Sequence, residues 1–279
     1  MSSLLRIRQL YPALAMNERR LADFLLSQPD RARHLSSQKL AEESGVSQSS
    51  VVKFAQKLGY KGFPALKLAL SESLADKDAI TVHNQILSDD PLKIVGEKLL
   101  SEKHSAIRAT LDINSEEMLL ETLRLIRSAN RIVLVGIGAS GLVAKDFSWK
   151  LMKIGINAVA EQDMHALLAS VQALHPGDLL LAISYTGERR EINLAAQEAQ
   201  RAGANVLAFT GFTPNTLQQC ATHCLYTVAE EQTTRSAAIS STAAQLTLTD
   251  LLFMAMIQRD PERASSHIRH SEALVKKLV

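Results

Sequence analysis

The sequence predicts an all-helical N-terminal domain at residues 1–75, a linker at 76–91, and a doubly wound parallel-sheet α/β domain at 92–279. Up to about Leu74, apolar residues recur at the spacing of amphipathic helices. The predicted linker is polar, with mixed charge and no sustained period. Beyond it, continuous apolar runs such as LLLAIS alternate with helical segments, which is typical of a parallel sheet covered by helices on both faces.

The first helices follow from this periodicity. One is predicted over residues 4–15, and a second over Glu18–Ser27 with Asn17 as its N-cap. A closing helix is predicted after Pro64. The expected core of this domain is made of apolar side chains from all its helices: Phe24, Leu40, Val52, Phe54, Leu58, Phe63 and Leu66.

Between these helices, the segment Ser36–Phe63 predicts two short helices joined by a tight turn. Ser36 or Ser37 can cap the first helix. Gly45 follows it, where a chain that leaves a helix in the left-handed region favours a residue without Cβ. Ser47 can cap the second helix. The small, glycine and β-branched positions all fall where the helices of a helix-turn-helix cross closely.

The second of these helices leaves polar side chains facing outward. Gln and Ser can bond base edges in the major groove, and Lys can contact guanine or phosphate. The predicted DNA-binding residues are Gln48, Ser49, Ser50, Lys53, Gln56 and Lys57. The alternative is an ordinary helical hairpin with a solvated face, since these residue types are common on surfaces. The register of the other positions favours double-stranded operator DNA as the partner.

The distribution of charge agrees with this interpretation. Residues 1–77 hold 12 Lys and Arg against 7 Asp and Glu, a net charge of +5, whereas the remainder holds 19 against 22, a net charge of −3. The whole-chain value of +2 conceals this division. A basic domain at one end of the chain suits a phosphate backbone as the partner of that domain alone.

Composition argues against a membrane protein and a secreted one. Of the 279 residues, 46% are hydrophobic and 22% charged, as in ordinary globular proteins. No apolar run approaches the roughly 20 residues of a membrane helix. The N-terminal residues lack the cationic start, apolar block and cleavage site of a signal peptide. We therefore expect a cytoplasmic protein with no membrane partner.

Two cysteines, Cys220 and Cys224, are too few for a disulfide framework. With His223 between them they offer at most three close ligands for a metal. Buried or idle thiols are the favoured interpretation, so we expect no metal site and no cofactor.

The elements of the second domain follow in order. Helices at about 92–111 and 115–128 lead into the buried strand RIVLVGIG and a helix over Leu142–Ile154. Four more strands are predicted, at Asn157–Glu161, Asp178–Ser184, Asn205–Phe209 and His223–Val228. Helices near 164–174, 188–202 and 237–257 separate or follow them, and the tail predicts one last amphipathic helix.

Two loops at strand ends stand out, because ligands of such sheets bind at the carboxyl ends of the strands. The first is GIGASG, residues 136–141. It resembles a dinucleotide glycine loop only superficially, since its spacing differs and no acidic residue follows in the expected setting. It is a weak indication of NAD binding.

The second loop, SYTGER, ends an apolar strand and precedes a helix. The hydroxyls of Ser184 and Thr186, with the free N–H groups of a helix N-terminus, can hold a phosphate. Arg189 could add a charge-assisted bond to the same anion. Either loop alone could be only a helix cap or a tight turn. Both at neighbouring strand ends favour a ligand site.

The loops GIGASG and SYTG together resemble the sugar isomerase (SIS) fold, and a helical DNA-binding domain ahead of an SIS domain resembles the RpiR family of bacterial transcriptional regulators. The resemblance covers nearly the whole chain. The segments VSQSSVVKFAQKLGYKGFPALKLAL and TGFTPN…CLYTVAEEQ are most similar to enterobacterial members. The family implies a dimer on a palindromic operator and an SIS domain that binds a phosphosugar, with an amino-sugar 6-phosphate among the ligands it suggests.

The resemblance also implies site residues. The first ligand loop would be formed by Gly136, Gly138 and Ser140. The phosphate would be held by Ser184, Thr186 and Gly187. The family commonly has threonine where this chain has Arg189, which could strengthen phosphate binding or swing away and leave the site altered.

Other candidates lie near the same strand ends. His165 could bond a sugar hydroxyl or be a satisfied structural histidine. Glu230, with Glu231 and Arg235, follows the last strand and is a weaker candidate.

A phosphosugar isomerase would need a positioned base, and His165, Glu188 and Glu230 are available, but the sequence singles out none of them. A sensor needs only different affinities for two states of the protein, and catalysis would destroy its own signal. We therefore predict a ligand-responsive regulator and no catalytic residues. The alternative is an isomerase or another SIS-type sugar-phosphate enzyme. A homodimer and a homotetramer both remain open, with the mostly apolar helix Ala237–Ile257 as a plausible assembly surface.

Overall fold

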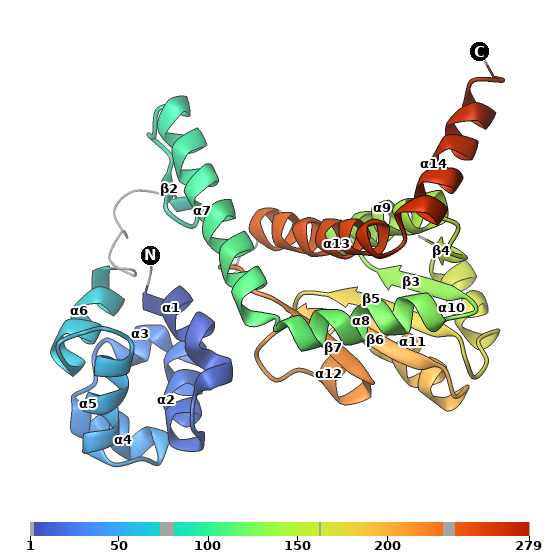
Figure 1. Cartoon of the computed structure of the whole chain (residues 1–279). Helices are drawn as coiled ribbons and strands as arrows, with labels where there is room; N and C mark the ends of the chain where they lie inside the picture. The colour runs from blue at the N-terminus through green and yellow to red at the C-terminus, as the bar shows by residue number, and fades with distance from the viewer. Residues whose placement is uncertain (1–2, 73–80, 162, 231–237, 279) are drawn as a thin grey trace. The chain divides into compact units, whose positions relative to one another are not determined.

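The computed structural model describes residues 3–72, 81–161, 163–230 and 238–278 (Figure 1). Its contacts divide the chain into two compact units. The first holds residues 1–105 with 229–236, and the second holds 106–228 with 237–279. The predicted fold class, helical first and then a parallel-sheet α/β domain, is confirmed.

The N-terminal unit is made of short helices and a small hairpin (Figure 1). In chain order its elements are α1 (Ser3–Leu10), the 3-10 turn η1 (Tyr11–Ala13), α2 (Met16–Ser27), α3 (Pro29–Ala32), α4 (Ser37–Ser44), α5 (Gln48–Lys57), α6 (Phe63–Glu72), β1 (Thr81–His83), β2 (Ile86–Leu87) and the first part of α7 (Leu92–Ile113). Most of the predicted core is buried, but Phe24 and Val52 are only half-buried.

Two predicted boundaries in this unit are wrong. The first helix ends at Leu10 because Pro12 has no N–H to donate and its ring clashes with the preceding turn. The second begins at Met16 rather than after a cap at Asn17. Its N-cap is Ala15, whose N–H donates to the Glu18 carboxylate at 2.8 Å.

The predicted linker at 76–91 contains regular structure. β1 and β2 pair antiparallel within it, and Asn84 between them has a φ of 45°. Asparagine tolerates this left-handed region better than most residues. The Asn84 amide also donates to the Glu230 carbonyl at 3.0 Å. Strands this short have no period that a sequence pattern could reveal.

The second unit is built on a five-stranded sheet (Figure 1). Its strands are β3 (Ile132–Gly136), β4 (Ala158–Ala160), β5 (Leu179–Ser184), β6 (Asn205–Gly211) and β7 (His223–Thr227). Their order is β4-β3-β5-β6-β7, and every pair is parallel. All six residues of β5 are buried, which explains its continuous apolar run.

Helices cover both faces of this sheet. One face packs against α8 (Glu116–Ser128), α9 (Ala139–Lys153) and α13 (Ile239–Arg259), and the other against α10 (Met164–Gln172), α11 (Arg190–Arg201) and α12 (Thr216–Cys220). Along β5, Leu179 and Leu181 face the first set, and Leu180 and Ala182 face the second. A last helix, α14 (Pro261–Val275), adds Ala264 to the first core.

Three departures from the predicted elements concern the strand ends. α9 begins at Ala139, three residues before the predicted Leu142, so that Ser140 lies in its first turn. α11 begins at Arg190 rather than at 188. α12 was not predicted; Asn215 caps it by accepting the Gln218 N–H at 3.2 Å.

None of the helices in the described ranges is long and apolar enough to cross a membrane.

Candidate functional site

The strand order places the two predicted loops side by side. β3 has β4 on one side and β5 on the other, and the chain reverses its winding direction between β3 and β5. Gly136, the last residue of β3, pairs with Ile183, the residue before the end of β5. The loops after both strands therefore flank the topological switch point, where open α/β sheets bind their ligands.

The first loop is held by contact of backbone on backbone. A Cβ on Gly136 would lie 2.6 Å from the Ser140 carbonyl oxygen, and one on Gly141 would lie 2.8 Å from the Gly136 oxygen. Gly138, with a φ of 60°, faces open space and is the N-cap of α9 without a side-chain bond. The N-terminus of α9 therefore presents backbone N–H groups and a half-buried serine, Ser140, at the carboxyl end of β3.

The second loop is a tight turn at the end of β5. The Gly187 N–H donates to the Ser184 carbonyl at 3.1 Å, and Gly187 has a φ of 68°. Ser184 is 5% exposed, whereas Thr186 is exposed and its hydroxyl accepts the Glu188 N–H at 3.4 Å. In the predicted phosphate site, the Ser184 side chain is thus buried and the Thr186 side chain is exposed to solvent.

The short helix α12 supports this turn. A Cβ on Gly187 would lie 2.0 Å from the Asn215 Oδ1, so only glycine fits beside the α12 cap. The Glu188 carboxylate accepts the Thr216 N–H at 2.9 Å and the Thr216 hydroxyl at 2.6 Å. Glu188, one of the bases considered for an isomerase, is therefore bound to α12 through both oxygens.

Three further predicted residues differ in their surroundings. Arg189 is the exposed N-cap of α11, and within the described part of the chain its guanidinium has no hydrogen-bond or ionic partner. His165 is exposed in the first turn of α10, which follows β4. Glu230 is grouped with the N-terminal unit. Glu231 and Arg235 lie outside the described residues.

The sequence did not single out Gln245 or Asn215. Gln245 lies on α13, is 1% exposed, and its Oε1 accepts a hydrogen bond from the Ser140 hydroxyl at 3.3 Å. Asn215 lies beside Gly187 across the end of β6. A polar residue within an apolar helix was the available signal for Gln245, and the Pro-Asn pair before Thr216 was the signal for Asn215.

In the N-terminal unit, the predicted caps and turn are confirmed. The Ser36 hydroxyl accepts the Lys39 N–H, and the Ser47 hydroxyl accepts the Ser50 N–H, both at 3.2 Å. Gly45 has a φ of 66°, and the Val46 N–H donates back to the Ala41 carbonyl at 2.9 Å.

The predicted DNA-binding residues lie on the outer side of α5, opposite the buried Val51 and Phe54. Five of the six are exposed and Ser50 is half-buried. The Gln48 amide donates to the Ser37 hydroxyl at 2.8 Å. Lys57 is not free, because its ammonium lies 2.6 Å from a Glu18 carboxylate oxygen.

Cys220 and Cys224 are free thiols. Cys220 is buried, and burial raises the pKa of the Cys224 thiol to about 11. Within the described residues, no three His, Cys, Asp or Glu side chains gather as a metal site would require.

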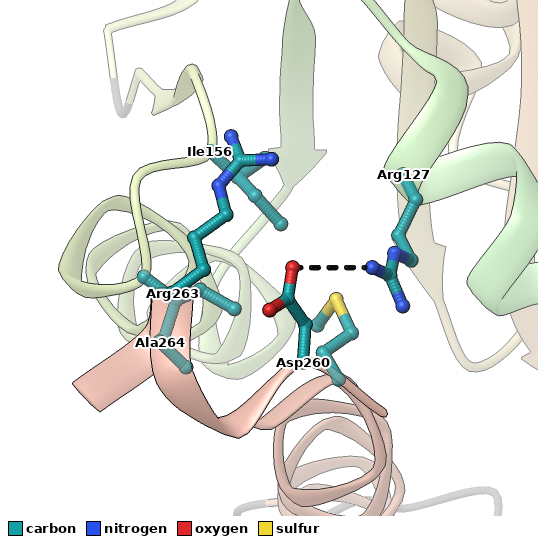
Figure 2. Close-up of a pocket in the computed structure, with 7 residues that line it drawn as sticks. Arg127, Ile156, Asp260, Arg263 and Ala264 are labelled. Atoms are coloured by element: carbon teal, nitrogen blue, oxygen red, sulfur yellow. Dashed lines mark ion pairs between the residues drawn. The ribbon is translucent and has the colours of Figure 1, made fainter. Parts of the chain in front are cut away.

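A separate hollow lies away from the two loops (Figure 2). Arg127 and Asp260 form an ion pair at its side, with 3.5 Å between nitrogen and oxygen. Ile156 in its wall precedes β4, so the hollow is at the amino edge of the sheet. Ligands of parallel sheets bind at the carboxyl edge, so this hollow is not the candidate ligand site.

Comparison with known proteins identifies the family. Residues 1–77 match the helix-turn-helix domain of the rpiR family, and residues 125–255 match the SIS domain. The HTH-type transcriptional regulator YfhH of Escherichia coli (strain K12) is 68% identical over 282 residues, with 100% of both chains covered. The chain belongs to the RpiR family. The predicted organisation of an RpiR-family transcriptional regulator is thus confirmed.

Solved structures agree on the fold. The Vibrio vulnificus NanR protein complexed with ManNAc-6P has a TM-score of 0.66 and 22% identity, covering 100% of this chain and 99% of its own. The sugar isomerase domain of an RpiR transcription factor from Sphaerobacter thermophilus has a TM-score of 0.57 and 21% identity, covering 64% and 98%.

Proposed function

We propose that this RpiR-family regulator binds a palindromic operator through α5 as a homo-oligomer, and that a phosphorylated sugar bound between the two loops changes its operator affinity. The observation that carries the proposal is the pairing of two features in one chain. One is a capped helix with an exposed polar face, and the other is a hydroxyl-lined turn at the switch point of an SIS sheet.

The DNA-binding half rests on the geometry of α5. Its first turn is capped by Ser47 and presents Gln48 and Ser49 at the surface, with Lys53 one turn further on. In a helix-turn-helix, the N-terminal residues of the second helix contact base edges in the major groove. A dimer places two such helices on a palindromic site.

The ligand-binding half rests on the turn after β5. Ser184, Thr186 and the N-terminus of α11 are the kinds of groups that hold a phosphate, and Arg189 has no competing partner among the described residues. The complex of NanR with ManNAc-6P supports a phosphosugar as the effector class. An amino-sugar 6-phosphate is the more specific proposal.

We favour a sensor over an enzyme because Glu188 is bound to α12 through both oxygens. The alternative, a phosphosugar isomerase, has its support in solved neighbours such as the phosphoheptose isomerase of Francisella tularensis, with a TM-score of 0.50 and 20% identity. Incubation of the purified protein with sugar phosphates, followed by separation of the isomers, tests this alternative. Isomer formation at rates typical of enzymes would establish catalysis.

The DNA-binding proposal predicts a loss of affinity without a loss of stability. An operator is first selected by the purified protein from a randomised DNA pool. Lys53→Ala and Gln48→Ala should each weaken binding to it by about fivefold to a hundredfold, as measured by fluorescence anisotropy. Tm should stay nearly constant, since both side chains are exposed. Lys276→Ala removes an equal charge from an exposed tail position and should bind normally. Normal binding by both α5 variants would show that the recognition helix is misassigned.

The ligand proposal is tested on the same operator. A panel of hexose, pentose and amino-sugar phosphates is screened for a rise in Tm, and the strongest ligand is added to the binding assay. The double variant Ser184→Ala, Thr186→Ala should keep basal operator binding and lose the ligand effect. Ser266→Ala, at an exposed serine of α14, is the control. An unchanged ligand effect in the double variant would place the effector in another pocket.

A further inference from the structure

Gln245 is the buried polar side chain that contacts the first loop. It projects from α13, is 1% exposed, and its Oε1 accepts the Ser140 hydroxyl at 3.3 Å. Its Nε2 is buried and has no hydrogen-bond partner within the described part of the chain. A buried amide nitrogen without an acceptor is costly, so its retention calls for a physical explanation.

The contact determines what Ser140 can offer a ligand. A hydroxyl has one proton and two lone pairs. Ser140 gives its proton to Gln245, so toward a ligand its oxygen can only accept. A phosphate dianion has only acceptor oxygens, and two acceptors do not bond. A sugar hydroxyl or an acetamido N–H has the donor that Ser140 lacks.

We propose that Gln245 is a positioning residue that makes Ser140 an acceptor, so that the α9 end of the site selects a hydroxyl or amide N–H of the sugar. The phosphate then lies at the turn after β5, where Ser184 and Thr186 have hydroxyls to donate. This inference rests on the proposed function. It adds the orientation of the ligand to that proposal. It also adds a residue that determines specificity, Gln245, which lies 105 positions along the chain from Ser140.

The unpaired Nε2 of Gln245 allows a role in ligand binding to be distinguished from a role in stability. Methionine has nearly the same shape as glutamine, no N–H group and only a weakly accepting sulfur, so Gln245→Met removes the unpaired nitrogen along with the amide oxygen acceptor. A residue retained for stability would lower Tm when replaced. A residue retained for binding should leave Tm equal or higher and weaken the ligand.

The test compares sugar phosphates with inorganic phosphate. Wild-type protein, Gln245→Met, Gln245→Glu and Ser140→Ala are titrated by calorimetry with ManNAc-6P, glucose 6-phosphate and inorganic phosphate. Gln245→Met should lower the affinity for the best-bound sugar phosphate by roughly fivefold to tenfold and change the affinity for inorganic phosphate by less than about twofold. Gln245→Glu keeps an acceptor for the Ser140 proton and should restore sugar-phosphate affinity. Ser140→Ala should match Gln245→Met, and the double variant should be no weaker than either alone.

Each other outcome has a distinct meaning. Equal losses for sugar phosphate and inorganic phosphate in Gln245→Met would place the phosphate at α9 and overturn the inference. Unchanged binding in Gln245→Met, or a wild type that binds no sugar phosphate better than inorganic phosphate, would also overturn it. If the wild type binds neither sugar phosphates nor inorganic phosphate, the proposed function itself fails.

Discussion

Gly187 shows how one residue can determine the shape of a ligand loop. Its φ of 68° favours glycine, and a Cβ there would lie 2.0 Å from the Asn215 Oδ1, which caps α12. Backbone strain and steric clash therefore act at one position.

We expect Gly187→Ala to destabilise the SIS domain by at least about 1–2 kcal/mol and to abolish the ligand effect, because the turn must move to relieve the clash. Chemical denaturation and the operator assay measure the two consequences. Gly96→Ala is the control, since Gly96 lies inside α7 and a Cβ there would have nothing within 4 Å of it. That variant should be neutral or slightly stabilising. Wild-type stability in Gly187→Ala would mean that the turn does not need glycine.

Lys57 illustrates a predicted contact residue that already has a partner. Burial by itself raises the pKa of Glu18, but the hydrogen bonds that Glu18 accepts from Lys57 and from the Ala15 N–H outweigh it, and the pKa is lowered from its ordinary value of 4.5. The pair joins α5 to α2. Its contribution is less than about 1 kcal/mol, because both side chains are partly exposed to water.

The sign of the shift gives a pH prediction. A carboxyl whose pKa is lower in the folded than in the unfolded chain stabilises the fold above pH 4.5, and this is lost as the pH falls through the folded pKa. Glu18→Gln should therefore lower Tm at pH 7, and the difference from wild type should vanish in strongly acidic buffer. Thermal unfolding from pH 7 to pH 3 measures this. Glu97→Gln, at an exposed position of α7, should show no such pattern.

Among the elements, α5 depends most directly on its cap. The Ser47 hydroxyl accepts the Ser50 N–H at 3.2 Å and also lies 2.8 Å from the hydroxyls of Ser49 and Ser50. Gln48 and Ser49, two of the residues proposed to contact bases, therefore lie in the same turn as the cap. Fraying of this turn would alter both stability and DNA binding.

We expect Ser47→Ala to cost about 1 kcal/mol of unfolding free energy and to weaken operator binding, because an N–H of the first turn loses its acceptor. Ser47→Asp supplies another N-cap acceptor and should restore the stability. Its added negative charge should still weaken DNA binding. Urea titrations and anisotropy on the same samples separate these effects. Full stability in Ser47→Ala would show that water replaces the cap without cost.

In the whole molecule, an exposed apolar surface is where we expect two copies to associate. Along α9, Leu142, Trp149 and Met152 recur on one side and are 64%, 56% and 48% exposed. On the neighbouring helix α13, Met254 is 58% exposed. The Lys150 ammonium bonds Asp250 and so joins the two helices. Exposed apolar side chains that gather in this way are typical of interfaces.

We therefore expect Trp149→Glu to weaken self-association at least tenfold, because a charge would be buried in the contact. Sedimentation velocity across a range of protein concentrations measures it. Leu92→Glu introduces the same charge at an 89% exposed leucine of α7 and should leave association unchanged. An unaltered assembly in Trp149→Glu would exclude this face as the interface. The predicted helix Ala237–Ile257 would contribute only its outer residues, since Leu248 and Leu252 of α13 are buried within the domain.

The amino-acid sequence was enough to predict the features that depend on neighbours along the chain. The cap of the first helix at Ser36 or Ser37, the cap at Ser47, the left-handed Gly45 and a buried strand at Asp178–Ser184 were all predicted. Capping, backbone strain and periodicity act over a few residues. The two loops were found because parallel strands end at one edge of a sheet.

Contacts between residues far apart in the sequence became visible only in the folded chain. The contacts of Gln245 with Ser140, of Asn215 with Gly187 and of Lys57 with Glu18 join positions 28 or more residues apart. No periodic pattern records such pairs, because they depend on how helices pack on the sheet and on one another. The orientation proposed for the ligand therefore comes from packing, whereas the presence of a ligand site was already predicted from the chain.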